Sequence, residues 1–197
     1  MSAALKLPPG PPGHMTVTEF LAWDSGDRSG RLWQLQDGIA EAMAPGSRNH
    51  GAIQSELARI IGNHLLAARP GCSVLTTPGI VPRIRSADNV RIPDLVVTCV
   101  PSRGERLVEA PVLVIEVLSP SNADETWANV WSYTTMPSVE EILVISSTSA
   151  TADLLRRGAD GAWPEAAMRI GGSDMMHLSS IGLELPLQAA YRTTDIT

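Results

Sequence analysis

A single glutamate interrupts one of the apolar stretches of this chain. Glu116 lies within Val112–Leu118, a run that otherwise contains only valine, leucine and isoleucine. Such a run is typical of a strand that is buried on both faces of a sheet. Because burying an unpartnered carboxylate costs several kcal/mol, Glu116 must be paired or must bind a cation. The run therefore predicts an interior strand that carries a functional carboxylate.

A second carboxylate follows a stretch of turn residues and a proline. Asp94 comes directly after Pro93 and directly before the predicted strand Leu95–Val100. Proline is tolerated at the start of a strand, so Asp94 is expected at a strand end. Two carboxylates on neighbouring strands, with no cation beside them, are typical ligands of a hard divalent cation.

The remaining pattern predicts one α/β domain of the α+β type over residues 15–197. A capping box at Thr16–Glu19 begins a short helix, and Asp37-Gly38 predicts a type I′ hairpin between Arg31–Gln36 and Ile39–Ala44. Two longer helices are expected over Ser47–Ala68 and Ala123–Thr134. The further strands and closing segments are Ser73–Thr76, Ile80–Arg85, Glu141–Ser146, Asp153–Arg157, Ala167–Ile170 and Ile181–Tyr191. This order indicates a mixed β-sheet flanked by helices.

Composition excludes several classes of protein. The net charge of −6 argues against a broad surface that coats nucleic acid, although a local basic patch is compatible with it. No apolar run approaches the roughly 20 residues of a membrane span, so no membrane association is expected. The leader Met1–His14 is rich in Pro and Gly, has no secretory h-region and is expected to be disordered. Lys6, within that leader, is the only lysine.

Short motifs narrow the chemistry further. Cys72 and Cys99 are isolated, which favours free thiols in a reducing cytosol and hence a cytoplasmic protein. The chain contains no G-x-S-x-G nucleophile elbow, no P-loop, no dinucleotide fingerprint and no H-E-x-x-H motif. The carboxylate pair is therefore the principal candidate site.

The segment from Ile92 to Ser146 resembles the Uma2 family, which is restriction-endonuclease-like within the PD-(D/E)-x-K nuclease fold. The resemblance extends over residues 15 to 191. Within this segment the matching stretches are Ile92–Val97, Val114–Ser121, Tyr133, Pro137–Glu141 and Val144-Ile145. Outside it, the matching stretches are Thr16–Leu21, Asp37-Gly38, Met43–Pro45, His50 and Gly182–Leu187.

This resemblance implies metal-dependent hydrolysis of phosphodiester bonds by an endonuclease. Asp94 and Glu116 would hold Mg²⁺ or Mn²⁺, and the main-chain carbonyl of Val117 would be a further ligand. Nucleic acid would be the substrate or ligand, with DNA as the first candidate and RNA as the second. A homodimer is plausible because related nucleases often pair.

Two positions depart from the pattern of these nucleases. The lysine of the broader fold is replaced by Leu118, and the lysine that Uma2 proteins offer on the next helix is replaced by Asn129. Asn129 shares a helical face with Glu125 and Tyr133, so Asn129 and Tyr133 are expected to line the site. Trp127, Val130 and Trp131 are expected on the opposite side, facing the core.

Other residues have open alternatives. His50 begins the long helix and would assist as a proton shuttle, or it is simply a polar residue at a helix start. Glu56 would supply a replacement carboxylate where the family's hairpin glutamate is Gln34, or it is an exposed helical glutamate. Arg83, Arg85 and Arg91 form a local basic group or are ordinary solvated arginines.

The missing lysine leaves two functions open. One is a weak metal-dependent endonuclease, in which an arginine brought from elsewhere in the fold replaces the lysine. The other is a catalytically degenerate nuclease fold that binds nucleic acid or a protein partner without cleavage.

Overall fold

The computed structural model describes residues 13–26, 28 and 30–196. The leader expected to be disordered therefore lies outside the described residues, except for its last two positions. Among the described residues, no helix is long and apolar enough to cross a membrane.

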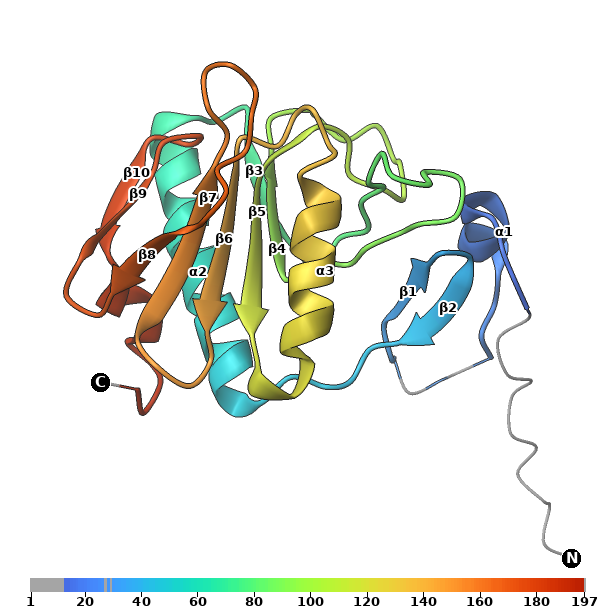
Figure 1. Ribbon diagram of the computed structural model, residues 1–197, viewed down its shortest axis with the longest axis horizontal. Helices are drawn as coiled ribbons and strands as arrows, with labels where there is room; N and C mark the ends of the chain where they lie inside the picture. Colours follow the sequence, from blue (N-terminus) through green and yellow to red (C-terminus); the bar gives the residue numbers. More distant parts are fainter. Residues whose placement is uncertain (1–12, 27, 29, 197) are drawn as a thin grey trace, which may run out of the picture.

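The centre of the fold is a six-stranded mixed sheet, shown in Figure 1. Its order is β3-β4-β5-β6-β7-β8, in which β5 and β6 are parallel and every other pair is antiparallel. The strands are β3 (Ser73–Thr76), β4 (Leu95–Thr98), β5 (Pro111–Leu118), β6 (Glu141–Ser146), β7 (Thr151–Arg156) and β8 (Met168–Gly171). The expected mixed sheet is confirmed, and the run around Glu116 is an interior strand.

Two helices cover opposite faces of this sheet. Helix α2 (Arg48–Ala68) begins at Ser47, whose side chain accepts the main-chain N–H of His50, and it buries an apolar stripe against one face. Helix α3 (Ala123–Tyr133) is the crossover between β5 and β6 and packs on the other face (Figure 1). Alternation along β5 sends Ile115 and Val117 toward α2 and Val114 toward α3. Glu116, between the two, shares the α3 face.

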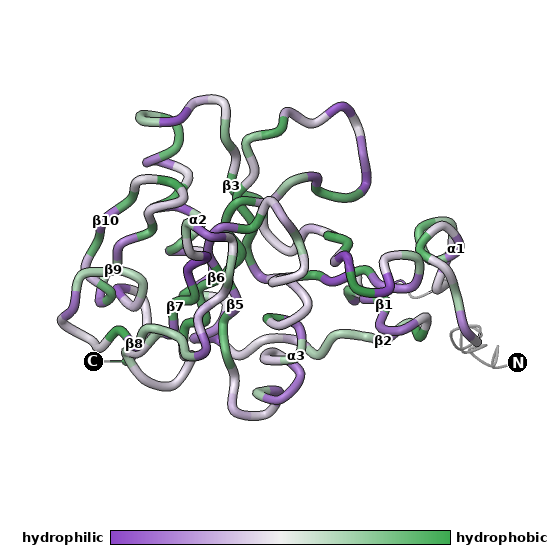
Figure 2. Tube along the Cα trace, turned by 45° about the horizontal axis from the view of Figure 1, so that its top comes forward, coloured by the Kyte–Doolittle hydropathy of each residue, from purple (hydrophilic) through white to green (hydrophobic). Residues whose placement is uncertain are grey.

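A small N-terminal lobe lies beyond the β3–β4 edge, away from β8, as Figures 1 and 2 both show. It consists of α1 (Val17–Ala22) and the hairpin β1 (Trp33–Gln36) and β2 (Ile39–Ala42). Asp37 and Gly38 have positive φ angles of 48° and 81°, as the expected type I′ turn requires. Leu35 packs into a third apolar cluster, so Gln34 and Gln36 face the opposite way, toward the main sheet and α3.

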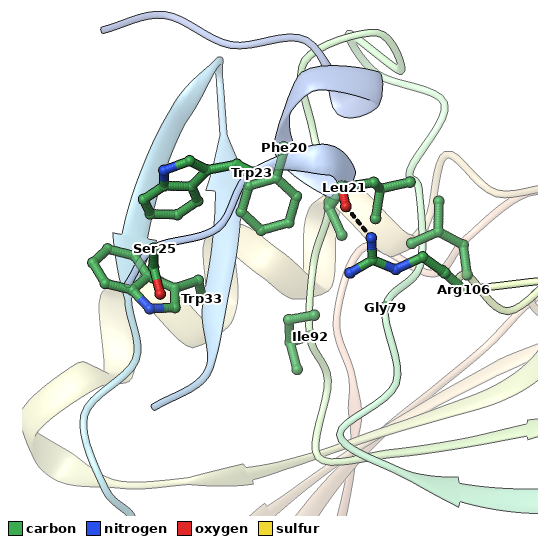
Figure 3. Close-up of a pocket in the computed structure, with 10 residues that line it drawn as sticks. Phe20, Leu21, Trp23, Ser25, Trp33, Gly79, Ile92 and Arg106 are labelled. Atoms are coloured by element: carbon green, nitrogen blue, oxygen red, sulfur yellow. Dashed lines mark hydrogen bonds between the residues drawn. The ribbon is translucent and has the colours of Figure 1, made fainter. Parts of the chain in front are cut away.

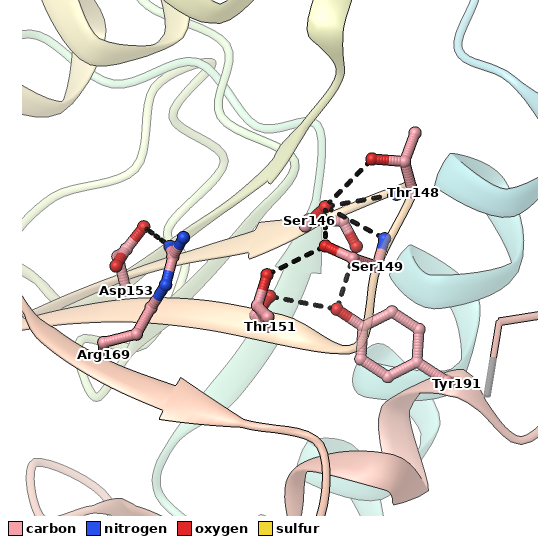
Figure 4. Close-up of polar contacts among 7 residues, drawn as sticks. All are labelled: Ser146, Thr148, Ser149, Thr151, Asp153, Arg169 and Tyr191. Carbon is pink, nitrogen blue, oxygen red and sulfur yellow. Dashed lines mark hydrogen bonds and ion pairs between the residues drawn. The ribbon is translucent and has the colours of Figure 1, made fainter.

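The C-terminal segment closes the α2 side of the sheet. The hairpin of β9 (Met175–Leu178) and β10 (Leu183–Pro186) is followed by a 3₁₀ turn, Leu187–Tyr191. Figure 4 shows the Tyr191 hydroxyl between the main-chain oxygens of Ser146 and Thr151, at 2.9 and 3.1 Å. Strand β9 was not expected from the sequence.

Three sequence-based expectations are wrong. Ile80–Arg85 is not a strand, because only Ile80 bridges to Arg91 and the chain then turns. Trp131 is 49% exposed, because the buried side of α3 is formed by Thr126, Val130 and Tyr133.

The third wrong expectation concerns the cysteines. Cys72 and Cys99 form a disulfide instead of remaining free. The register that pairs Ser73 with Thr98 places the two cysteines opposite each other, one residue farther along.

Candidate functional site

Asp94 and Glu116 face each other across two adjacent strands. The antiparallel register pairs Leu95 with Ile115, and one further step brings Asp94 opposite Glu116. Both residues are buried, with 9% and 8% of their surface exposed. The site thus lies where β4 begins and β5 ends, next to the first turn of α2 at the lower edge of the sheet in Figure 1.

The Asp94 carboxylate is held from two sides. Its Oδ2 accepts the main-chain N–H of Val117 at 2.7 Å and lies 3.2 Å from Nε2 of His50. Ladder pairing between the two strands ends at Leu95, and the Asp94 side chain accepts the Val117 N–H that lies beyond this last pair. The structure therefore brings His50 together with Asp94 and gives Asp94 a fixed orientation.

Glu116 is oriented by a hydrogen bond from α3. The Tyr133 hydroxyl donates to its Oε1 at 2.6 Å, and Tyr133 is completely buried. Burial raises the pKa of Glu116 well above its usual value, and the nearby Asp94 charge raises it further, while the bond from Tyr133 opposes the shift. Burial likewise raises the pKa of Tyr133, an effect that Glu116 reinforces and the positive charge of Arg91 opposes.

The donor set of this pair fits a hard divalent cation. Among the described residues, neither carboxylate forms an ion pair with lysine or arginine, and the two lie close enough for the Asp94 charge to raise the pKa of Glu116. No group of three or more His, Cys, Asp or Glu side chains in the described ranges is arranged to hold a metal ion, so main-chain oxygens and waters would have to complete a coordination shell. Mg²⁺ commonly retains several waters, so a carboxylate pair is a sufficient protein contribution.

The outer face of α3 connects the site to the N-terminal hairpin. Gln34 donates through Nε2 to Glu125 at 2.7 Å, although Gln34 is only 2% exposed and its own Oε1 lacks a partner. One turn farther along α3, Asn129 is half-buried and its Oδ1 also lacks a partner. Asn129 and Tyr133 thus lie on successive turns of α3, and of the two only Tyr133 contacts a carboxylate of the pair.

Arg91 was not singled out as a site residue by its sequence. Arg83 and Arg85 are exposed, whereas Arg91 is only 6% exposed. Its Nη1 donates to Oε1 of Gln36 at 2.7 Å, and burial lowers its pKa. The nearby proline and the apolar neighbours Val90 and Ile92 were the only sequence signal that this arginine differs from the other two.

Glu56 is not available to the site. It is buried rather than exposed, and it accepts bonds from Arg59 at 2.6 Å and Arg192 at 2.8 Å. Hydrogen bonds from Arg59, followed by those from Arg192, lower the pKa of Glu56 to about 2. Its role is to tie α2 to the C-terminal segment.

A separate hollow of about 250 Å³ lies between α1, the hairpin and the loop residues Gly79, Ile92 and Leu107. Figure 3 shows Trp23 and Trp33 on one side of it and Arg106 on the other, where Arg106 donates to the main-chain oxygen of Leu21. Neither Asp94 nor Glu116 lines this hollow.

Comparisons with known proteins agree with this architecture. The sequence model of the Uma2 family, described as "Putative restriction endonuclease", matches residues 17–188. An uncharacterized protein of Synechocystis, slr1290, is 31% identical over 188 residues, which cover 94% of this chain and 95% of the relative.

A solved structure shows the same fold. The crystal structure of "a putative nuclease belonging to DUF820" from Anabaena variabilis superposes with a TM-score of 0.73 at 17% identity, over 90% of this chain and 97% of that one. At this identity the likeness establishes the fold alone. With the family match over most of its length, the chain belongs to the Uma2 family.

Proposed function

We propose that this protein is a divalent-metal-dependent endonuclease that hydrolyses phosphodiester bonds of nucleic acid, with DNA as the first candidate. The observation that carries the proposal is the buried pair of Asp94 and Glu116, which face each other across adjacent strands with no described lysine or arginine paired to either. Membership of a family described as "Putative restriction endonuclease" supports the same class of reaction.

In this proposal Asp94 and Glu116 hold Mg²⁺ or Mn²⁺, with the main-chain carbonyl of Val117 as a further ligand. The cation, when bound, supplies the positive charge that activates water and stabilises the phosphate during hydrolysis. The hydrogen bonds from the Val117 N–H and the Tyr133 hydroxyl fix the directions of the two carboxylates before any ligand arrives.

His50 and Asn129 have supporting roles. His50, 3.2 Å from Asp94, accepts or returns a proton at the edge of the site. Asn129 contributes a neutral amide where a lysine would otherwise place a charge.

A second function is favoured by one observation. Leu118 and Asn129 occupy the two positions at which a lysine is expected, so a nuclease fold that binds nucleic acid without cleaving it is the alternative. Loss of one such electrostatic group typically reduces a rate by about 10²–10³.

The deciding experiment is cleavage of end-labelled DNA and RNA in Mn²⁺ or Mg²⁺. Wild type is compared with Asp94→Ala, Glu116→Gln and the control Glu165→Gln, which removes an exposed carboxylate in the β7–β8 connection at the opposite end of the sheet (Figure 1). Cleavage by wild type and Glu165→Gln, abolished in the two site variants, is the expected result. No cleavage by wild type, together with metal-independent binding of the same oligonucleotides, would establish the alternative.

A further inference from the structure

Arg91 is a buried cation without an anionic partner. Its side chain is 94% buried, since 6% is exposed, yet no described carboxylate forms an ion pair with it. Its single hydrogen bond is to the neutral amide of Gln36, and its Nε has no partner. A buried guanidinium normally has a carboxylate or phosphate beside it, because desolvation is otherwise uncompensated.

Arg91 contacts the N-terminal hairpin through Gln36 and lies near α3. Its charge interacts electrostatically with Tyr133, with Asp37 and Glu41 of the hairpin region, and with Glu125; Tyr133 and Glu125 lie two turns apart on α3 with Asn129 between them. Tyr133 in turn contacts Glu116 at 2.6 Å. Tyr133 is therefore coupled to both Arg91 and Glu116, electrostatically to the first and by a hydrogen bond to the second.

Unpartnered polar atoms gather around the same place. The Nε of Arg91, Oε1 of Gln34 and Oδ1 of Asn129 all lack partners. Gln34 and Gln36 project from one face of the hairpin, and they contact Glu125 and Arg91 respectively. Amide side chains can present either an oxygen or an N–H₂ group after a half-turn, so they suit a ligand with both donors and acceptors.

We propose that Arg91 is the phosphate-binding cation of this site, and that its guanidinium takes a phosphate oxygen of the nucleic-acid backbone beside the Asp94/Glu116 pair. This inference rests on the proposed function for the identity of the ligand. The only lysine lies at position 6, outside the described residues, so a permanent positive side-chain charge within the described fold must come from arginine. Half-buried Asn129 and exposed Glu125 mark the side from which the ligand reaches this edge of Arg91.

The test is metal-free binding, which does not depend on cleavage. Fluorescein-labelled single- and double-stranded 20-mers are titrated in EDTA over a salt series with wild type, Arg91→Gln, Arg91→Lys and Arg103→Gln. Arg103 is an exposed arginine in the β4–β5 connection, at the other end of the sheet, so its variant is a matched loss of one positive charge.

We expect Arg91→Gln to bind about tenfold more weakly, as for loss of one charged hydrogen bond. The slope of log affinity against log salt should fall by about 0.7–0.9, as for loss of one phosphate contact. Arg91→Lys should keep the slope, with weaker binding because it loses the planar fork. Arg103→Gln should retain both.

Other outcomes overturn the inference. An unchanged salt slope in Arg91→Gln, or no binding by wild type, rejects Arg91 as a phosphate ligand. Thermal unfolding is measured in parallel, and a folded Arg91→Lys with wild-type slope supports the inference even if Arg91→Gln unfolds. If wild type binds through Arg91 but never cleaves, this inference is supported and the proposed nuclease is rejected. If wild type cleaves but Arg91→Gln keeps the wild-type salt slope, the nuclease is supported and this inference is rejected.

Discussion

The hydroxyl of Tyr133 donates a 2.6 Å hydrogen bond to the carboxylate of Glu116, and both groups are buried. This bond stabilises the charged carboxylate, but burial and the charge of Asp94 act more strongly in the opposite direction. Without a cation, the folded protein therefore binds a proton at Glu116 more tightly than the unfolded chain does.

The first prediction is a pH-dependent loss of stability in the metal-free protein. Because the pKa of Glu116 is raised when folded, its contribution is fully present below its ordinary value of 4.5 and is lost as pH rises toward the folded pKa. Glu116→Gln should remove this slope and exceed wild type near pH 7 by about 1 kcal/mol, or about 2–4 °C in Tm. Urea denaturation in EDTA from pH 4.5 to 8 measures it.

The control for this prediction is Glu165→Gln, which changes an exposed carboxylate and should keep the wild-type slope. A Glu116→Gln protein that is less stable than wild type at neutral pH would show that the charged carboxylate is satisfied by the protein alone.

The second prediction concerns metal binding. A divalent cation favours the deprotonated pair, so Mn²⁺ should stabilise wild type by about 2.7 kcal/mol at a hundredfold excess over its Kd. Asp94→Asn and Glu116→Gln should lose this stabilisation, and Glu165→Gln should retain it. Differential scanning calorimetry with and without Mn²⁺ at pH 7.5 gives the comparison, and equal stabilisation of all four proteins would place the metal elsewhere.

Local pattern was sufficient to predict the carboxylate pair. Glu116 stands out because its neighbours in sequence are all aliphatic, and Asp94 stands out because a proline precedes it at a strand start. Both signals lie within a few residues of the functional group. The helices and most strands were predicted for the same reason, since their periodicity is local.

Long-range contacts explain what the sequence did not reveal. Arg91 is buried because Gln36, 55 residues earlier, covers it, and Glu56 is neutralised by Arg192, 136 residues later. Cys72 and Cys99 meet only because β3 and β4 pair in one particular register. None of these relationships has a periodic or motif signature.

The third prediction tests whether Arg91 and residue 129 serve the same ligand. Asn129 lies on α3 between Glu125 and Tyr133, both of which interact electrostatically with Arg91, so Asn129→Lys would place a new cation on the helix that neighbours Arg91. In an Arg91→Gln background, adding Asn129→Lys should raise the cleavage rate by a factor of about 10²–10³. Single-turnover cleavage in Mn²⁺ provides the measurement.

Its matched control is Ala128→Lys, one residue away on the exposed side of α3. That variant adds the same charge to the same helix but directs it toward solvent. Equal rescue by both lysines would mean that the effect is general electrostatic attraction of nucleic acid rather than a defined site.

The fourth prediction concerns the disulfide between Cys72 and Cys99. It closes a loop with a sequence separation of 27 residues, and the chain-entropy relation assigns such a loop roughly 3–4 kcal/mol. The bridge joins the residue before β3 to the residue after β4, and Asp94 directly precedes β4 at its other end, so loss of the bridge should loosen the β3–β4 pairing next to the site. Reduction should therefore both lower Tm and weaken the stabilisation by Mn²⁺.

Thiol titration under denaturing conditions establishes the redox state. The control is the double variant Cys72→Ser/Cys99→Ser, whose Tm should not respond to reductant. A reduced protein with the Tm of the oxidised one would show that strand pairing alone holds this edge.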